Sequence, residues 1–450
     1  MIAPARVAAY QATAALSQGR IDLAHALTAV RDSLQDERDR ALAAEITIGV
    51  QRRRLALDWL IAHYARRPTD RLDPEILDIL RLSCYQLLHL TRVPASAVVN
   101  DAVTLAGQLK KRSAQGLVNA VLRAISRGRP KLPLPPRPKM ATDEAAALDY
   151  LSITLSHPRW LVSRLYRRYG FEATESWLRF NNTPAPLTLR VNRFHNSRPT
   201  LIERLAAEHV TVRPARWARD ALIVESGNPL RGAGLGEGWF LVQDEASQLV
   251  AQLATPHPGQ RVLDACASPG GKATAFAAAM HGEGLVVACD LRQSRLDLLC
   301  RTVAASGAPN IRVVQADLRH RPPFLRPFDW VFVDAPCSGL GTLRRDPDIR
   351  WRRSEGDLHS LSAAQMAILR QAADAVSPGG MLIYATCSSE PEENELIVEA
   401  FLAETPGFEP VNLRGADQLS PGLINERGRF ETLPHVHELE AFFGAVFKRN

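Results

Sequence analysis

Two cysteines of this chain stand where a thiol can take part in chemistry. Cys337 lies in Asp-Ala-Pro-Cys-Ser-Gly and Cys387 in Ala-Thr-Cys-Ser, and each follows a short apolar run typical of a buried strand, at 330–333 and 381–384. The carboxyl ends of neighbouring parallel strands meet at one edge of a sheet, where α/β enzymes place their reacting groups. The sequence therefore predicts two thiols in one crevice. The alternatives are a disulfide, although nothing in the sequence indicates an oxidising compartment, and two inert buried thiols.

A glycine-rich turn follows an earlier predicted strand, at 261–263. It reads Asp-Ala-Cys-Ala-Ser-Pro-Gly-Gly-Lys over 264–272 and leads directly into a helix at 273–280, so a ligand can approach the backbone and the amino end of that helix. A P-loop needs Gly at 266 and Ser or Thr at 273, and a dinucleotide fingerprint needs G-x-G-x-x-G; neither is present. The remaining ligand is S-adenosylmethionine, and its candidate contacts in the turn are Cys266, Ala267, Ser268, Pro269, Gly270, Gly271 and Lys272.

Each of the next predicted strands ends in an acid. Asp290, Asp317 and Asp334 follow the strands at 285–288, 311–315 and 330–333. The first lies twenty residues after Gly270, the place where an acid meets ribose hydroxyls, and the second is then placed to accept from an adenine amino group. Single acids at such positions are often helix caps, but three strand-end acids beside a glycine-rich turn favour a cofactor site.

Methyl transfer to carbon gives the two thiols a use. C5 of a pyrimidine becomes nucleophilic only after a nucleophile has added at C6, and a thiolate is suited to that addition. After methylation the C5 proton must leave and the thiol must be expelled, which calls for a second group. Two cysteines in one crevice fit this division of labour, and the spacing alone does not tell which one attacks.

These residues require a chain of several domains. Residues 1–127 have the Ala-, Leu- and Arg-rich helical spacing of an all-α domain, and 128–142 form a proline-rich basic linker that should run extended on something acidic. A small α+β module is predicted over 143–235, with strands at 187–192 and 221–225. Strands alternating with helices over 236–450 predict a parallel, doubly wound α/β sheet.

Composition limits the partners. The chain has 450 residues, a formal net charge of +7 and a pI near 9.3, and its basic residues cluster, which favours a polyanionic partner. The six cysteines form no C-x-x-C pair, and His435 and His437 alone do not make a metal-binding motif. No bound metal is therefore expected. No signal peptide or membrane span is expected either, and we expect a cytoplasmic protein. The basic clusters are 52–54, 110–112, 127–139 and 344–353.

The motifs around Cys337 and Cys387, the turn at 264–272, the segment 344–351 and Gln-Asp-Glu-Ala-Ser-Gln at 243–248 together resemble the RNA 5-methylcytosine methyltransferases. The resemblance covers residues from about 240 to the end. It implies a Rossmann-like class I S-adenosylmethionine-dependent methyltransferase domain. Residues 80–88 and 116–123 resemble the NusB fold, and a NusB-like domain ahead of this catalytic domain is typical of family members that methylate small-subunit rRNA.

Carried over by motif, the resemblance implies that Cys387 is the nucleophile, that Cys337 assists product release and that Asp334 contacts the target base at its Watson–Crick edge. It also implies that the cofactor is held by 266–272, Asp290, Asp317 and Asp334. DNA cytosine methyltransferases instead use a Pro-Cys nucleophile like that at 336–337, so the Thr-Cys of 386–387 favours RNA. Two departures are Ser268, where relatives usually have Ala, and the stretch 435–440.

A cytosine in a helix hides C6, so the target must be flipped or unpaired, as in a stem-loop. The arginines of 344–353 are expected to clamp phosphates beside it, with Trp351 either stacking or packing. Arg52–Arg54 and Lys110–Arg112 could bind RNA, or the NusB-like domain could dock a protein. We expect a monomer acting on small-subunit rRNA. The alternatives are a tRNA methyltransferase and a non-catalytic RNA-binding assembly factor.

Overall fold

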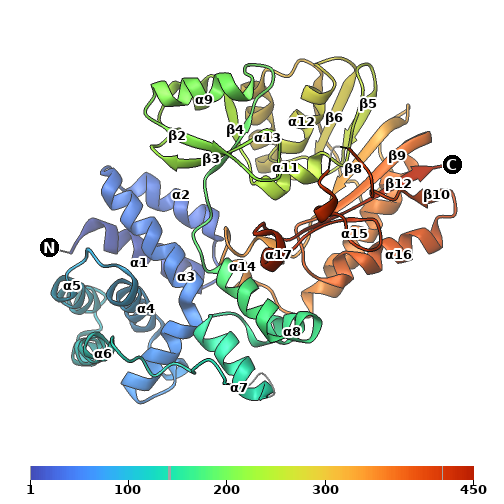
Figure 1. Ribbon diagram of the computed structural model, residues 1–450. Coiled ribbons are helices and arrows are strands. Elements are labelled where there is room, and N and C mark those ends of the chain that lie inside the picture. The colour runs from blue at the N-terminus through green and yellow to red at the C-terminus, as the bar shows by residue number, and fades with distance from the viewer. Residues whose placement is uncertain (1, 140–142, 418) are drawn as a thin grey trace. The chain divides into compact units, whose positions relative to one another are not determined.

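The computed structural model describes residues 2–139, 143–417 and 419–450, and the chain forms two units (Figure 1). The first contains residues 1–183 and 343–355, and the second contains 184–342 and 356–450. The segment 343–355 therefore leaves the second unit shortly after Cys337 and packs within the first. The predicted end of the linker, at 140–142, lies outside the described residues.

The first unit begins with a helical domain. Its helices start at side-chain caps where the sequence supplies them: Asp22 accepts from the backbone of His25, and Asp36 accepts from the backbone of Arg38 and Asp39. Their apolar faces meet in one core. The helices are α1 (Pro4–Ser17), α2 (Leu23–Ser33), α3 (Glu37–Ala65), α4 (Pro74–His89), α5 (Ala95–Gln108) and α6 (Gln115–Gly128), with short turns η1 (Thr69–Arg71) and η2 (Arg112–Ala114).

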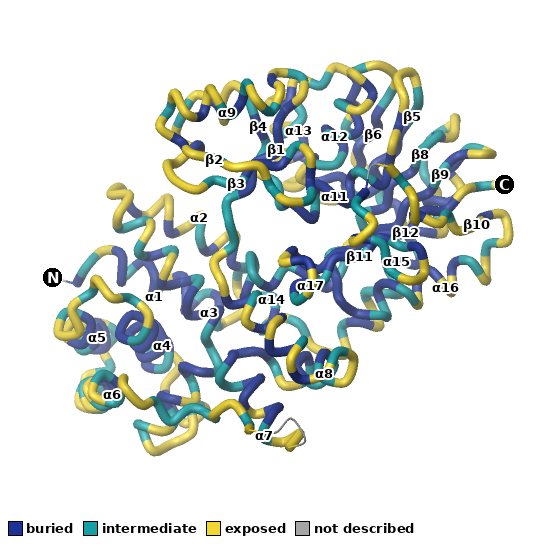
Figure 2. Tube along the Cα trace, in the orientation of Figure 1, coloured by how far each residue is buried: buried dark blue, intermediate teal, exposed yellow. Residues whose placement is uncertain are grey.

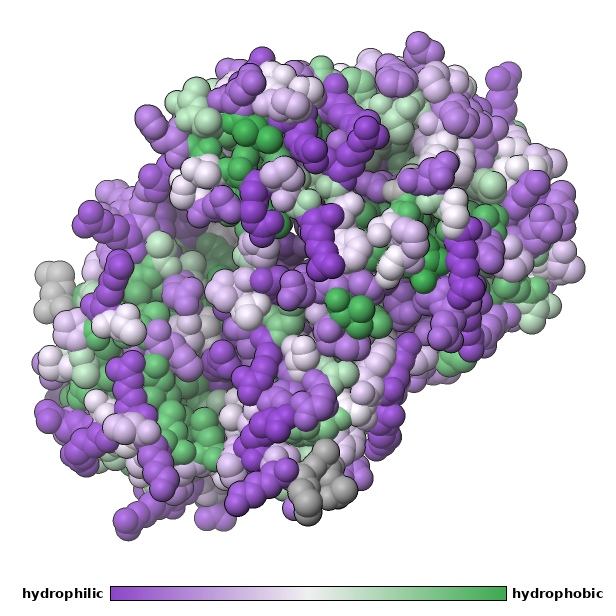
Figure 3. Space-filling model, in the orientation of Figure 1, coloured by the Kyte–Doolittle hydropathy of each residue, from purple (hydrophilic) through white to green (hydrophobic). Residues whose placement is uncertain are grey.

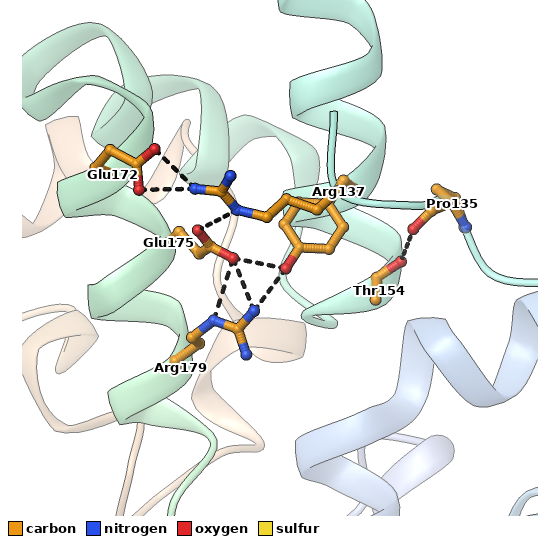
Figure 4. A network of polar contacts seen from close by, with 7 residues as sticks. Pro135, Arg137, Thr154, Glu172, Glu175 and Arg179 are labelled. Atoms are coloured by element: carbon orange, nitrogen blue, oxygen red, sulfur yellow. Dashed lines mark hydrogen bonds and ion pairs between the residues drawn. The ribbon is translucent and has the colours of Figure 1, made fainter. Parts of the chain in front are cut away.

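The proline-rich linker then runs without regular secondary structure, as predicted. Its acidic partner is in the chain itself: Arg137 pairs with Glu172 and Glu175 on the helix α8, at 2.7 and 2.9 Å (Figure 4). Arg179 approaches Glu175 from the other side at 2.8 Å. Arg137 thus fastens the linker to α8. The elements that follow the linker are α7 (Glu144–Asp149), η3 (Tyr150–Thr154) and α8 (Arg159–Asn181).

The second unit opens with a small antiparallel sheet of strand order β2-β3-β1-β4. The strands predicted at 187–192 and 221–225 are confirmed as β1 and β3. The predicted end of this module, residue 235, falls before β4, which pairs with β1. The elements are β1 (Thr188–Val191), α9 (Arg198–Ala207), β2 (Thr211–Pro214), β3 (Ala221–Ser226), α10 (Ala233–Gly236) and β4 (Phe240–Val242).

The larger sheet has the order β10-β12-β9-β8-β5-β6-β7, with β11 also paired to β12. All five predicted strands are present and pair in parallel, as β5 to β9. The antiparallel strands after β9 were not predicted. The strands are β5 (Arg261–Asp264), β6 (Leu285–Asp290), β7 (Ile311–Gln315), β8 (Phe328–Asp334), β9 (Val376–Thr386), β10 (Phe408–Pro410), β11 (Phe430–Thr432) and β12 (Phe442–Arg449).

Helices cover both faces of the larger sheet. One core cluster includes side chains of α11, α12 and α13, and another includes side chains of α15 and α16. The central strands are largely buried (Figure 2), which explains their continuous apolar runs. The helices and turns are α11 (Glu245–Ala251), α12 (Gly271–Ala279), α13 (Gln293–Ser306), η4 (Leu340–Thr342), α15 (Asp357–Asp374), η5 (Pro391–Glu393), α16 (Glu395–Glu404), η6 (Pro421–Leu423) and α17 (Pro434–His437), while α14 (Ile349–Arg352) belongs to the first unit.

Hydrophilic side chains dominate the face of the molecule in Figure 3, with apolar ones in small groups between them. Among the described residues, no helix is both long and apolar enough to cross a membrane. The same residues contain no group of three or more His, Cys, Asp or Glu side chains placed to hold a metal ion.

The altered tail at 435–440 forms the short helix α17 and the turn into β12. His437 accepts from the backbone N–H of Leu433 at 2.8 Å, and its other ring nitrogen contacts the carbonyl of Gly422 at 2.9 Å. This histidine holds the turn together, so the replaced stretch has a structural use.

Candidate active site

The two cysteines lie side by side at the carboxyl ends of β8 and β9. These strands pair in parallel with Asp334 opposite Ala385, so the loops that follow them leave the same sheet edge. The Sγ atoms of Cys337 and Cys387 are 3.2 Å apart, which is a contact between thiols and far longer than a disulfide bond. Neither cysteine forms a disulfide, and both are partly exposed, so the disulfide alternative is wrong for this structure.

The two thiols differ in their surroundings. The hydrogen bond with Cys387 raises the pKa of the Cys337 thiol, as do burial and the nearby charges of Cys387 and Glu393. The Cys337 thiol therefore stays protonated near neutral pH. A protonated Cys337 beside Cys387 can serve as an acid or, once deprotonated, as a base.

Asp334, the last residue of β8, lies beside the glycine-rich turn. Its Oδ2 is 2.5 Å from Nζ of Lys272, and Nζ is also 3.5 Å from Oγ of Ser247. Burial opposes the charge on Lys272, but the charge and hydrogen bond of Asp334 outweigh it and raise the lysine pKa. The pair places a fixed positive charge between the turn and the cysteine-bearing strand.

The turn fits a ligand that approaches the backbone. Gly270 has φ +105°, and a Cβ there would lie 2.8 Å from the Leu299 side chain, so only glycine is free of strain. It also precedes α12, whose first N–H groups have no partner within the helix. A glycine-rich turn at the amino end of a helix fits the carboxylate end of S-adenosylmethionine.

Ser268, the departure in the turn, has a defined place. Its hydroxyl donates to the carbonyl of Arg295 at 3.0 Å, and the Arg295 guanidinium donates to the Ser268 carbonyl at 3.0 Å. The change from the usual Ala therefore adds a bond between the turn and α13 and leaves the backbone cradle in place.

The two cofactor acids predicted downstream lie at the ends of the next strands, but both already have protein partners. Asp290 accepts from the backbone N–H of Ser268 and Leu291 at 3.3 and 2.9 Å. Arg319 donates two hydrogen bonds to the carboxylate of Asp317, from Nε at 2.9 Å and from Nη2 at 2.7 Å. Arg319 lowers the pKa of Asp317 to about 2. The carboxylate oxygens of Asp317 can accept further hydrogen bonds, so its pairing with Arg319 is compatible with the predicted contact to an adenine amino group.

The order of the strands arranges the site. Because β9, β8, β5, β6 and β7 are consecutive neighbours, the thiols occupy one part of the sheet edge and the turn, Asp290 and Asp317 follow in sequence along it. Asp334 lies at the junction. A cavity of about 320 Å³ opens beside this junction, lined by Pro269, Lys272 and Asp334 and by Phe240 and Gln243 of the small sheet and its following loop.

Two buried acids were missed by the sequence analysis. Asp264 ends β5, is 0% exposed and lacks a well-formed hydrogen bond among the described residues. Burial raises its pKa to about 7, with Lys272 opposing the shift. Its place at the end of the first strand, before the glycine-rich turn, was the available signal. Glu393 lies under the loops that carry the two cysteines, and no pattern in the sequence predicts that position.

Two residues of the basic segment after Cys337 make contacts within the first unit. Arg350 is 0% exposed and donates to the carbonyl of Ser156 and the side chain of Asn182 at 2.9 and 3.1 Å. Trp351 donates to the carbonyl of Gln51 at 2.7 Å, so it packs instead of stacking on a base. The predicted phosphate contact is therefore wrong for Arg350, because this side chain is buried in the first unit.

The cluster Arg52–Arg54 is also not an open RNA-binding surface. Arg52 donates to the carbonyl of Arg344 at 3.2 Å, and Arg54 lies over the ring of Trp351. Burial lowers the pKa of all three arginines. Arg52 and Arg54 thus contact the 343–355 segment. In the second cluster, Lys111 pairs with Asp73 at 3.0 Å.

Three protein-family models match the chain: 16S rRNA methyltransferase RsmB/F over residues 251–448, the NusB family over 3–127, and the RsmF/B-like ferredoxin-like domain over 157–231. These matches confirm the predicted fold class, an all-α NusB-like domain, a small α+β module and an α/β methyltransferase domain.

Curated proteins match over nearly the whole length. Ribosomal RNA small subunit methyltransferase B of Pseudomonas putida is 36% identical over 91% of this chain and 91% of its own. The probable ribosomal RNA small subunit methyltransferase B of Bacillus subtilis is 33% identical over 92% of this chain and 91% of its own.

Solved structures match as well. The crystal structure of PH0851 covers 100% of this chain and 99% of its own, with TM-score 0.82 and 25% identity. A methyltransferase homolog protein from Pyrococcus horikoshii covers 68% of this chain and 99% of its own, with TM-score 0.59 and 26% identity.

Proposed function

Because the chain belongs to the RsmB/F family of 16S rRNA methyltransferases, we propose that it methylates C5 of one cytosine in small-subunit rRNA through a covalent bond between Cys387 and C6. Family membership confirms three predictions: the chain is an enzyme, it methylates rRNA, and its cofactor is S-adenosylmethionine. It also removes the non-catalytic alternative. The observation that carries the proposal is the 3.2 Å contact between Cys337 and Cys387 beside the cofactor strands.

In the proposed reaction, the Cys387 thiolate forms a bond to C6 of the cytosine, and the electron pair of the C5–C6 double bond makes C5 nucleophilic. S-adenosylmethionine supplies the methyl group that C5 takes. A base then removes the C5 proton, the double bond re-forms, and the Cys387–C6 bond breaks. The step balances as follows: the RNA exchanges the C5 proton for the methyl group, the base carries that proton away, S-adenosylhomocysteine is the second product, and Cys387 is released as a thiolate.

We assign the second role to Cys337. Its sulfur lies 3.2 Å from that of Cys387, and its raised pKa keeps it protonated near neutral pH. That position allows it to assist release of Cys387 from the methylated base. The assignment of attack to Cys387 and release to Cys337 rests on the family motif, and the contact between them supports a shared task.

Asp334 is assigned to the Watson–Crick edge of the cytosine. An acid there can hold a proton on N3 as the adduct forms, which draws charge away from the ring. Lys272 fixes the orientation of the carboxylate. The cofactor is assigned to the turn 266–272, to Asp290 and Asp317 and, at the junction, to Asp334.

We also propose the wider organisation predicted from the sequence, a NusB-like domain at 1–127, a linker at 128–142, a small module at 143–235 and a catalytic domain at 236–450, with one change. The small module extends through β4, because this strand pairs with β1. The target cytosine is unpaired or flipped, since C6 is hidden inside a helix. The protein acts as a monomer, in the cytoplasm where bacterial rRNA is made.

Bisulfite sequencing tests the proposal. Unmodified small-subunit rRNA and tRNA are incubated with the protein and S-adenosylmethionine, and cytosines that resist conversion are mapped. One protected cytosine in small-subunit rRNA, absent with Cys387→Ser, is the expected result. Protection in tRNA alone would overturn the rRNA substrate and keep the chemistry, and protection that survives Cys387→Ser would overturn the assigned nucleophile.

A further inference from the structure

Glu393 is a buried carboxylate beneath both cysteine loops. It ends the short turn η5 and is 0% exposed. Four hydrogen-bond donors point at its two oxygens. They are the backbone N–H of Ser338 at 2.8 Å, the Ser338 hydroxyl at 2.5 Å, the Ser388 hydroxyl and the side-chain amide of Gln365 at 2.9 Å.

The positions of the two serines give this network its meaning. Ser338 directly follows Cys337, and Ser388 directly follows Cys387. One carboxylate therefore holds the backbone next to each thiol, on loops that come from different strands. The two hydroxyls also lie 3.2 Å from each other, the same separation as the two sulfur atoms.

The residues on the other side of each cysteine are held by the neighbours of Glu393. Gln365 donates to the carbonyl of Pro336 at 3.1 Å, and Asn394 contacts the Thr386 hydroxyl at 2.5 Å. Asn394 also donates to the Ser388 carbonyl at 3.0 Å. Of these three side chains, Glu393 is the one that contacts both loops directly.

We propose that Glu393 is the positioning residue that holds Cys337 and Cys387 in contact, so that one thiol can act on the adduct formed by the other. This rests on the proposed function for its catalytic consequence, but the geometry can be tested by itself. Glu393 accepts from the backbone N–H of Ser338 and from the NH₂ group of Gln365, and neither of these two groups can accept a hydrogen bond. In a glutamine at this position the oxygen can still accept from these two groups, but the NH₂ group then faces the two serine hydroxyls, whose protons lose their charged acceptor. The two loops therefore lose the charge-assisted hydrogen bonds to their shared anchor.

The test uses the full-length protein with Glu393→Gln and a chemical probe of thiol proximity. Methylarsonous acid bridges two adjacent thiols through two As–S bonds and releases two water molecules, whereas a single thiol holds it weakly. Wild type should bind one equivalent tightly through this pair, with Cys337→Ala as the control that removes it. Glu399→Gln removes a carboxylate from the surface of α16, where it pairs with Arg427, and should bind as wild type does.

We expect Glu393→Gln to weaken arsenical binding at least about tenfold and to lower kcat at least about tenfold, since small displacements of reacting groups cost up to about a hundredfold. KM for S-adenosylmethionine should change less than about threefold, because the cofactor turn is untouched. Arsenical affinity equal to wild type overturns the proposal, and so does an unchanged kcat.

A second pair of variants protects the test against misfolding. Ser338→Ala and Ser388→Ala each remove one hydroxyl from Glu393 and keep the carboxylate buried. Each should weaken arsenical binding by a smaller factor than Glu393→Gln. If neither variant weakens arsenical binding, the proposal is overturned. If wild type makes no 5-methylcytosine, the proposed function fails, while the arsenical series still decides whether Glu393 holds the thiols together.

Discussion

The amino group of Lys272 lies 2.5 Å from the carboxylate of Asp334, and this ion pair joins the first turn of α12 to the end of β8. The side chains are 12% and 26% exposed, so the pair is shielded from water and salt more than a surface pair is. Asp334 raises the pKa of Lys272 despite the burial, so the lysine stays charged at neutral pH. A charged lysine fixed at this point orients Asp334 between the cofactor turn and the cysteine loop.

Asp334→Asn should lower kcat about 10²- to 10⁴-fold, because an amide cannot hold the proton on N3 as a carboxyl can. Single-turnover methylation of rRNA measures this, together with the dissociation constant for S-adenosylmethionine. Asp329→Asn is the matched control, since Asp329 lies on β8 and accepts from the backbone N–H of Arg261. A large loss of cofactor affinity with normal kcat at saturation would assign Asp334 to the cofactor instead of the base.

Cys337→Ala should trap a covalent protein–RNA adduct. Without the thiol that assists release, Cys387 stays attached to C6 after methylation. Denaturing electrophoresis with labelled rRNA and S-adenosylmethionine should show a band of reduced mobility that Cys337→Ala/Cys387→Ser lacks. Turnover without an adduct in Cys337→Ala would contradict the release role.

The sequence predicted the catalytic sheet well, because buried parallel strands are short apolar runs that end in recognisable polar residues. Cys337, Cys387 and Asp334 could be placed at one edge for that reason. The strands β10, β11 and β12 were missed. Two of them, β10 and β11, have only three residues each, and all three pair antiparallel, outside the pattern of parallel strands that the prediction followed. β2 was missed because it is mostly exposed and carries no apolar run.

The basic residues were harder to interpret, because charge clustering does not reveal burial. Arg350 reads as a surface charge in the sequence, yet it is buried with its guanidinium turned onto carbonyl groups. Glu393 similarly reads as part of an acidic stretch. Both depend on contacts between segments far apart in the sequence, which local patterns do not encode.

The buried carboxyl of Asp264 predicts a dependence of stability on pH. Its pKa is about 7 in the folded chain and about 3.9 in an unfolded one. Between these values the folded chain keeps a proton that the unfolded chain releases, so its contribution to stability is complete below about pH 4 and is lost as pH rises through about 7. The full loss is on the order of 4 kcal/mol.

Asp264→Asn removes this titration. The melting temperature of the variant relative to wild type should therefore rise between pH 5 and pH 8, measured in the absence of cofactor. A constant difference across that range would contradict a raised pKa.

Arg350 should be essential to the stability of the first unit, residues 1–183 and 343–355. Its guanidinium donates to the carbonyls of Ser156 and Leu343 and to the side chain of Asn182, at 2.9, 3.2 and 3.1 Å. Arg350→Met keeps much of the volume but leaves these buried acceptors unsatisfied, at about 1–3 kcal/mol for each group. We expect the free energy of unfolding to fall by at least about 2 kcal/mol, measured by urea denaturation followed by circular dichroism.

Arg352→Ala is the control: this half-exposed side chain pairs with Asp348 and should change the free energy of unfolding by less than about 1 kcal/mol. Equal stability of the two variants would mean that the 343–355 segment does not depend on Arg350 for its place in the first unit.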